Sequence, residues 1–229
     1  YRKAQTRLHV LSYLFWECTL RCNLSCRHCG SDCLSESTVP DMPLADFIKV
    51  LDSLSGKVEP SSTFIVLTGG EPLLRKDLEE CGRAFTERGS PWGMVSNGRA
   101  LTAQRLDALL RCGLRSLTIS CDGLEESHDW MRGRGSFEHC LEAIRNTATS
   151  GIAVFDVATC VNKRNFWELH EIKDLLVSSG VQRWRLFTVF PKGRAAHEPD
   201  LDITPKQLVA VLDFIREVKN EGGNGISFE

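Results

Sequence analysis

The sequence has little net charge and no long hydrophobic run. Its 229 residues include 28 lysines and arginines and 30 aspartates and glutamates, which give a formal net charge of -2 at pH 7. A near-neutral chain is not expected to bind nucleic acid, because such binding depends on clustered positive charge. No apolar stretch approaches the roughly 20 residues of a membrane span, since the run at residues 8–16 is short and interrupted. These absences predict a soluble protein without nucleic-acid or membrane partners.

Phosphate-binding signatures and low-complexity segments are also missing. The chain contains neither a Walker sequence nor G-x-G-x-x-G, so a phosphate-binding barrel enzyme has no support. No internal linker is visible, and residues 1–229 are long enough to bury a substantial core, so we expect a single domain. The first residue is Tyr1 and the chain stops in an apparent strand at residues 227–229, which predicts a fragment of a longer protein.

Short β-rich runs alternate with amphipathic helical segments along the chain. Strands are predicted at residues 8–16, 63–67, 92–95, 114–120, 154–161 and 183–190. Apolar residues recur between them at helical spacing, as at Leu106, Leu109 and Leu110. Six strand-then-helix units in succession predict an α/β fold with parallel strands. The pattern fits a closed or partly closed barrel and also an open doubly wound sheet, and both gather ligands at the carboxyl ends of the strands.

Cysteine is abundant and unevenly distributed. Of the ten cysteines, five lie between Cys18 and Cys33, and this clustering favours a metal site in a reducing cytoplasm. Cys22, Cys26 and Cys29 have the spacing C-x-x-x-C-x-x-C directly after the first predicted strand. Three thiolates at this spacing can hold three irons of a cubane and leave the fourth iron open to a small molecule. A structural zinc with Cys18 or Cys33 as fourth ligand, or simply buried thiols, is the alternative.

A glycine-rich segment follows the second predicted strand. In Thr68-Gly69-Gly70-Glu71-Pro72, the two glycines let the backbone approach a ligand closely, and the carboxylate can bind an ammonium group. The same letters also describe an ordinary turn in which Pro72 opens the next helix and Glu71 is solvated.

Together, the run Cys22-Asn-Leu-Ser-Cys26-Arg-His28-Cys29 and the Gly-Gly-Glu-Pro segment resemble the two signature loops of radical S-adenosylmethionine (radical SAM) enzymes. The resemblance extends over nearly the whole chain and implies a partial (β/α)6 barrel of parallel strands. It implies a [4Fe-4S] cluster on the three cysteines, with S-adenosylmethionine at the open iron and Glu71 near its amino group. His28 takes a position that is usually aromatic, which implies that it helps to seat the nucleotide.

The implied reaction is radical chemistry on a substrate that the sequence does not identify. An electron donor such as flavodoxin or ferredoxin reduces the cluster, S-adenosylmethionine is cleaved, and a 5'-deoxyadenosyl radical takes hydrogen from the substrate. The protein's part is to orient the reactants and exclude water. A non-catalytic iron-sulfur or zinc-binding protein is the hypothesis from another class.

Weaker candidates follow the third and fourth predicted strands. Ser120 and Asp122, in Ser-Cys-Asp-Gly, can contact ribose hydroxyls, and Asn97, in Ser-Asn-Gly, is a further cofactor-binding candidate. Asn-Gly and Asp-Gly are also common turn dipeptides. Asn162 and Arg185 are placed to reach the mouth of a barrel and receive no role.

Two further segments resemble members that carry a cysteine-rich auxiliary domain, the SPASM type. They are residues 122–137 and the run Pro191-Lys-Gly193-Arg194-Ala195. The resemblance implies an auxiliary domain beyond Glu229 and favours a peptide or protein substrate. A step in cofactor or haem biosynthesis by the same chemistry is the close competitor.

Overall fold

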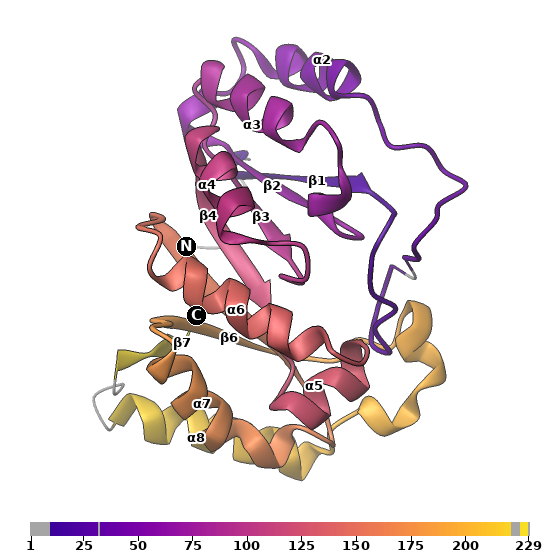
Figure 1. The fold of residues 1–229 in the computed structure, drawn as a ribbon, viewed down its shortest axis with the longest axis vertical. Helices are drawn as coiled ribbons and strands as arrows, with labels where there is room; N and C mark the ends of the chain where they lie inside the picture. The colour runs from indigo at the N-terminus through magenta and orange to yellow at the C-terminus, as the bar shows by residue number, and fades with distance from the viewer. Residues whose placement is uncertain (1–9, 32, 221–224, 229) are drawn as a thin grey trace.

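Seven strands form one parallel sheet whose spatial order follows the sequence. The computed structural model describes residues 10–31, 33–220 and 225–228. The strands are β1 (Tyr13–Thr19), β2 (Phe64–Gly69), β3 (Trp92–Ser96), β4 (Leu114–Ser120), β5 (Val154–Val161), β6 (Arg183–Thr188) and β7 (Ser227–Phe228). Each strand pairs in parallel with the next one. The sheet is open, with β1 and β7 at its two edges, as a partial barrel requires (Figure 1). The predicted α/β fold is confirmed.

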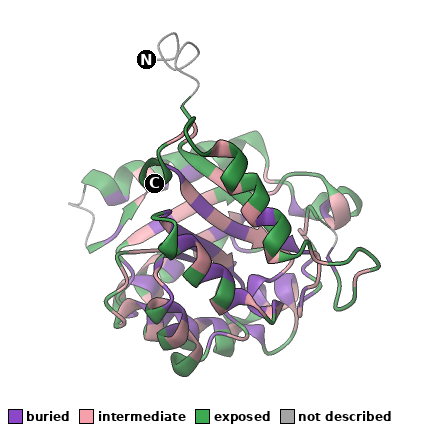
Figure 2. Cartoon of the chain, turned by 90° about the horizontal axis from the view of Figure 1, so that it is seen from above, coloured by how far each residue is buried: buried purple, intermediate pink, exposed green. Residues whose placement is uncertain are grey.

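Helices follow the strands and pack on one face of the sheet. They are α2 (Leu44–Leu54), α3 (Leu78–Glu87), α4 (Ala103–Arg111), α5 (Glu125–Arg132), α6 (Ser136–Ala148), α7 (Leu169–Ser178) and α8 (Pro205–Asn220). Short 3-10 helices are η1 (Pro60–Ser62), η2 (Pro72–Leu74), η3 (Phe166–Glu168), η4 (Gly193–His197) and η5 (Pro199–Leu201). The helices carry buried and exposed residues side by side, as expected for elements with one buried stripe (Figure 2). No helix in the described ranges is long and apolar enough to cross a membrane.

Aromatic stacking attaches the first helices to the sheet. The rings of Trp16 in β1 and Phe47 in α2 stack with centroids 4.0 Å apart, and Phe85 of α3 meets both edge-on. All three side chains are at most 5% exposed. Because side chains alternate along a strand, Tyr13 and Phe15 point to the opposite, inner face, where they are 62% and 65% exposed.

The bounds of β2 to β6 agree with the predictions within two residues, whereas β1 differs by more. The predicted strand at residues 8–16 begins outside the described residues, and the observed β1 starts at Tyr13 and continues to Thr19. Its pairing starts at Tyr13 and Phe64 because β2 begins there, directly after η1. Likewise, β6 stops at Thr188 rather than residue 190 because its last partner, Val161, ends β5. A strand ends where its neighbour ends, which its own composition does not reveal.

Candidate functional site

The loop after β1 places four cysteines close together at the carboxyl ends of the strands. Cys22, Cys26 and Cys33 are buried with Leu24, and Cys29 is half-buried against them. The amide of Cys22 donates to the carbonyl of Leu34 at 2.7 Å and closes the loop on itself. Cys18 lies apart from this group, because its side chain belongs to the core between sheet and helices.

A segment from far along the chain fastens this loop. Arg194 in η4 donates from Nε to the carbonyl of Cys26 at 2.8 Å and from Nη1 to the carbonyl of Cys33 at 3.0 Å. Its amide donates to the carbonyl of Cys29 at 2.9 Å. The preceding Gly193 has φ +57, and a Cβ there would lie 2.4 Å from the Cys29 carbonyl oxygen. A larger residue does not fit this approach, which brings together the loops that follow β1 and β6 (Figure 1).

The Gly-Gly-Glu-Pro segment packs directly on the cysteine loop. The amide of Gly70 donates to the carbonyl of Thr19 at 2.7 Å, and the amide of Glu71 donates to that of Arg21 at 2.8 Å. A Cβ on Gly70 would lie 2.1 Å from the Arg21 carbonyl oxygen. The absence of a side chain at Gly70 therefore allows the two loops to contact each other, in addition to any contact with a ligand.

Glu71 is a buried carboxylate that joins the ends of β2 and β3. Oε1 accepts hydrogen bonds from Ser96 Oγ at 2.9 Å and from the Leu73 amide at 3.1 Å, and Oε2 accepts from the Asn97 amide at 2.8 Å. Burial raises the pKa of Glu71, although these hydrogen bonds oppose the shift. Pro72, also buried, opens η2 as the turn interpretation predicted.

Asn97 connects β3 to the cysteine loop. Its Nδ2 donates to Asn23 Oδ1 at 2.8 Å and lies 3.8 Å from Cys22 Sγ, while its Oδ1 accepts from the Arg99 amide at 2.9 Å. An amide this close to a cysteine sulfur is placed to donate to a thiolate. The sequence offered only the Asn-Gly dipeptide as a signal, which is more typical of a turn.

These loops enclose a cavity of about 230 Å³. Its lining comes from the cysteine loop, the glycine-rich loop, the ends of β3 and β4, and two arginines: Cys22, Leu24, Cys26, His28, Cys29, Cys33, Thr68, Gly69, Gly70, Glu71, Val95, Ser96, Asn97, Ser120, Arg132 and Arg194. Another cavity, of about 260 Å³, lies between the end of α2 and the start of β2, and no cysteine lines it.

A buried ion pair lies behind this cavity. Asp122 Oδ2 accepts from Arg132 Nε at 2.6 Å and lies 3.2 Å from His28 Nε2, while Oδ1 accepts from the Cys160 amide at 2.8 Å. Asp122 is wholly buried and Arg132 is 8% exposed. Burial raises the pKa of Asp122, but Arg132, His28 and the Cys160 amide outweigh it and hold the pKa below its usual value. Asp122 therefore orients Arg132 and His28, which do line the cavity.

His28 is neutral in this setting. Burial lowers its pKa to about 4, against the opposing effect of the Asp122 carboxylate. With Nε2 donating to Asp122, Nδ1 is left as an acceptor that has no hydrogen-bond partner in the described ranges.

The three signature cysteines are not arranged for a single small ion. Among the described residues, two groups bring three potential ligand atoms within 4.8 Å of one another, and neither contains Cys22, Cys26 or Cys29. A tetrahedral zinc with bonds of about 2.3 Å needs sulfur atoms about 3.8 Å apart. Burial raises the pKa of the Cys22 and Cys26 thiols, so a bound metal must displace their protons.

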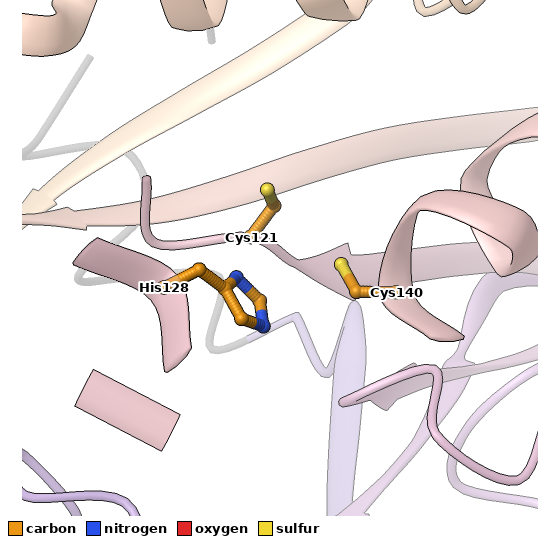
Figure 3. Close-up of side chains that lie close together, drawn as sticks. All are labelled: Cys121, His128 and Cys140. Atoms are coloured by element: carbon orange, nitrogen blue, oxygen red, sulfur yellow. The ribbon is translucent and has the colours of Figure 1, made fainter. Parts of the chain in front are cut away.

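One of those two groups lies on the helix-covered side of the sheet, where Cys121, His128 of α5 and Cys140 of α6 lie close together (Figure 3). All three are buried. His128 Nδ1 accepts from the Asp122 amide at 3.2 Å, so its lone pair is already used. We assign this group to packing between sheet and helices.

A sequence model of the Radical SAM superfamily matches residues 16–176. The chain belongs to the radical SAM superfamily. It is 30% identical over 206 residues to an AdoMet-dependent heme synthase of Oleidesulfovibrio alaskensis, covering 89% of the chain and 52% of that protein. It is 29% identical over 204 residues to the mycofactocin maturase MftC of Mycobacterium tuberculosis, covering 88% and 51%.

Solved structures agree on the radical SAM fold. SuiB of Streptococcus suis, crystallised with S-adenosylmethionine, superposes with a TM-score of 0.76 at 13% identity, over 99% of this chain and 52% of SuiB. The chain spans about half the length of the curated relatives that it matches. The cofactors of the superfamily are a [4Fe-4S] cluster and S-adenosylmethionine, as the signature loops implied.

Most predicted site residues of this radical SAM chain line the 230 Å³ cavity beside the cysteine loop. These are Cys22, Cys26, His28, Cys29, Gly69, Gly70, Glu71, Asn97 and Ser120. Pro72 and Asp122 lie outside the lining, and ribose contact by Asp122 stays a prediction. The sequence analysis missed Ser96, Arg132 and Arg194. Both arginines occur in the two segments that resembled SPASM-type members, and that resemblance was the available signal.

Proposed function

We propose that Cys22, Cys26 and Cys29 hold the [4Fe-4S] cluster and that S-adenosylmethionine occupies the adjoining cavity. The observation that carries this proposal is that all three cysteines line the same cavity as Gly69, Gly70 and Glu71. When bound, the two cofactors supply reductive cleavage of S-adenosylmethionine to methionine and a 5'-deoxyadenosyl radical that takes hydrogen from the substrate.

The donor set fits a cluster better than a structural zinc. The three sulfurs stand further apart than the ligands of one tetrahedral ion, and a cubane is a larger body. Cys18 faces the helix-side core, so of the two proposed fourth ligands only Cys33 shares the cavity. Asn97 Nδ2, next to Cys22 Sγ, stabilises the thiolate form by hydrogen bonding.

Polar groups around the cavity match the polar groups of S-adenosylmethionine. Glu71 provides negative charge for the amino group, and Arg132 provides positive charge for the carboxylate. Ser120 contacts a ribose hydroxyl, and His28 seats the nucleotide by packing. Asp122 keeps Arg132 and His28 in place, while the buried loops exclude water from the reactive species.

The substrate class that we propose is a peptide or protein. Support comes from MftC, a maturase at 29% identity, and from SuiB, which has also been solved with its precursor peptide SuiA. Tetrapyrrole chemistry is the second candidate, and the heme synthase at 30% identity favours it. The reductant is a flavodoxin- or ferredoxin-type protein. A reducing cytoplasm suits the ten cysteines, none of which forms a disulfide within the described part of the chain.

The test is anaerobic reconstitution with iron and sulfide, followed by dithionite, S-adenosylmethionine and detection of 5'-deoxyadenosine by mass spectrometry. We expect the wild-type chain to form the nucleoside and Cys26→Ser to lose both cluster and product. Cys33→Ser, on the same loop, is the matched control and should keep both. Electron paramagnetic resonance of the reduced cluster should change when S-adenosylmethionine is added, because the cofactor binds the open iron.

Two results would contradict the proposal. Loss of the cluster in Cys33→Ser would indicate four cysteine ligands and a non-catalytic iron-sulfur protein. Stoichiometric zinc with no iron uptake would indicate a structural metal site.

A further inference from the structure

A polar trio crosses the inner face of the sheet from β4 to β6. Asp156 Oδ1 accepts from Thr118 Oγ1 at 2.9 Å, and Oδ2 accepts from Arg185 Nε at 2.6 Å. Arg185 Nη2 also donates to Thr118 Oγ1 at 2.6 Å. Thr118 and Asp156 are 4% and 5% exposed, so the groups that fix the guanidinium are themselves buried.

Arg185 lies level with the residue of β4 that lines the cysteine cavity. In the sheet register, Arg185 pairs with Ala158 and Ala158 pairs with Ser120. Paired residues on parallel strands point to the same face, and neighbouring strands lie about 4.8 Å apart. The Cα atoms of Arg185 and Ser120 are therefore two strand spacings, or about 10 Å, apart, and the Arg185 guanidinium spans this gap to reach Thr118 on β4. Between them, Ala158 contributes only a methyl group to this face.

The Arg185 guanidinium has N–H groups that Asp156 and Thr118 do not engage. Asp156 and Thr118 engage Nε and Nη2, while Nη1 donates no hydrogen bond to any described residue. The Arg185 side chain is 32% exposed. A guanidinium whose plane is fixed on one edge presents its other edge as a fork that matches a carboxylate. Because Asp156 already balances the charge, Arg185 recognises an anion through directed hydrogen bonds more than through long-range attraction.

Apolar surface lies on the same inner face. Phe187, two residues after Arg185, is 46% exposed, and the Arg185 guanidinium lies 5.8 Å from the centre of its ring. Tyr13 and Phe15 expose further aromatic surface on the inner face of β1. A ligand that contacts both Arg185 and Phe187 has an apolar part next to a carboxylate.

We propose that Arg185, held by Asp156 and Thr118, binds a carboxylate group of the substrate, an assignment that rests on the radical chemistry proposed for the neighbouring cavity. Because the guanidinium reaches Thr118, two residues before Ser120 on β4, a carboxylate on this fork holds the body of the substrate beside the cavity. An acidic peptide side chain and a tetrapyrrole propionate share this chemistry.

Binding assays separate the two sources of carboxylate and need no radical step. Probes are a short glutamate-containing peptide with its glutamine counterpart, and a tetrapyrrole with free propionates with the same ring as its primary amides. We expect one acid to bind the reconstituted wild-type protein more tightly than its neutral counterpart. Arg185→Gln should reduce that preference roughly ten- to hundred-fold. Arg115→Gln, which removes an exposed arginine near the start of β4, is the control and should keep the preference.

A second variant distinguishes loss of carboxylate binding from loss of folding. Arg185→Gln leaves the buried Asp156 unpaired, whereas the double variant Asp156→Asn/Arg185→Gln removes both charges and should lose the same preference. The subsite is refuted if either variant, shown to be folded by circular dichroism, keeps the wild-type preference, or if the wild type prefers neither acid. Formation of 5'-deoxyadenosine by the wild type remains the separate test of the radical chemistry, so the two failures can be told apart.

Discussion

At the scale of single residues, His28 shows how burial sets a protonation state beside the cysteines. Its pKa falls to about 4 because the surrounding protein desolvates the charged form more than Asp122 stabilises it. The unfolded chain binds a proton at His28 near the ordinary value of 6.5, whereas the folded chain does not. Folding must therefore release this proton whenever the pH lies between the two values.

The pH dependence of stability tests this description. His28 binds more protons in the unfolded state, so its contribution is lost as the pH falls below 6.5 and toward 4. Between about pH 7.5 and about pH 5.5, the cluster-free wild type should lose about 1.4 kcal/mol of unfolding free energy through His28. Urea unfolding of the wild type and of His28→Phe measures the difference. Equal losses in both proteins would show that His28 does not titrate in this way.

The residues that sequence reasoning missed have one property in common. Arg194 reaches carbonyls 168 and 161 positions earlier in the chain, and Arg132 pairs with a carboxylate on the preceding strand end. Arginines are mostly exposed and their partners here are not local, so no spacing rule identifies them. In contrast, the signature cysteines are only a few residues apart, so their spacing in the sequence is enough to predict that they lie close together.

At the scale of elements, η4 (Gly193–His197) contacts the cysteine loop although it lies more than 150 positions later in the chain. Arg194 and Gly193 hold the backbone of the cysteine loop, although neither adds a ligand atom for iron. The cysteine loop has a small apolar cluster of its own, so these contacts carry much of its order. We therefore expect η4 to control cluster retention.

Two glycine-to-alanine variants separate the steric effect of an added Cβ from the backbone cost of a positive φ. Gly193→Ala places a Cβ 2.4 Å from the Cys29 carbonyl oxygen, whereas Gly151, which also has a positive φ, would have nothing within 4 Å of an added Cβ. Each substitution carries a backbone cost of about 1–2 kcal/mol, but only the first displaces the cysteine loop. After reconstitution, Gly193→Ala should hold less than half the iron of Gly151→Ala. Equal iron contents would show that the loop does not depend on η4.

The strands were more predictable than the loops for a physical reason. A strand buried on one face alternates apolar residues, and β4 and β5 match their predicted bounds. Loop structure depends instead on which segments meet, as where the glycines of the Gly-Gly-Glu-Pro segment pack on the cysteine loop. The sequence analysis predicted that those glycines allow close approach but named a ligand as the partner.

At the scale of the whole molecule, one apolar core underlies the open sheet. A single cluster of buried residues extends from Trp16 in β1 to Ile226 beside β7. Phe47 in α2 packs on Trp16, and Phe214 in α8 packs on Trp184 in β6. Because consecutive strands pair without interruption, both ends of the sheet share this core.

This continuity predicts that the cluster-free chain unfolds as one domain. Phe47 and Phe214 are each 4% exposed, so Phe47→Ala and Phe214→Ala should each cost about 3–5 kcal/mol. If the sheet is one cooperative unit, either variant lowers hydrogen-exchange protection equally in β2 and in β5, which mass spectrometry follows separately. If Phe47→Ala weakened only β1 to β3 and left β5 and β6 protected, the chain would consist of two units that open independently. Equal loss throughout is expected, because every strand between the two phenylalanines has both of its neighbours in place.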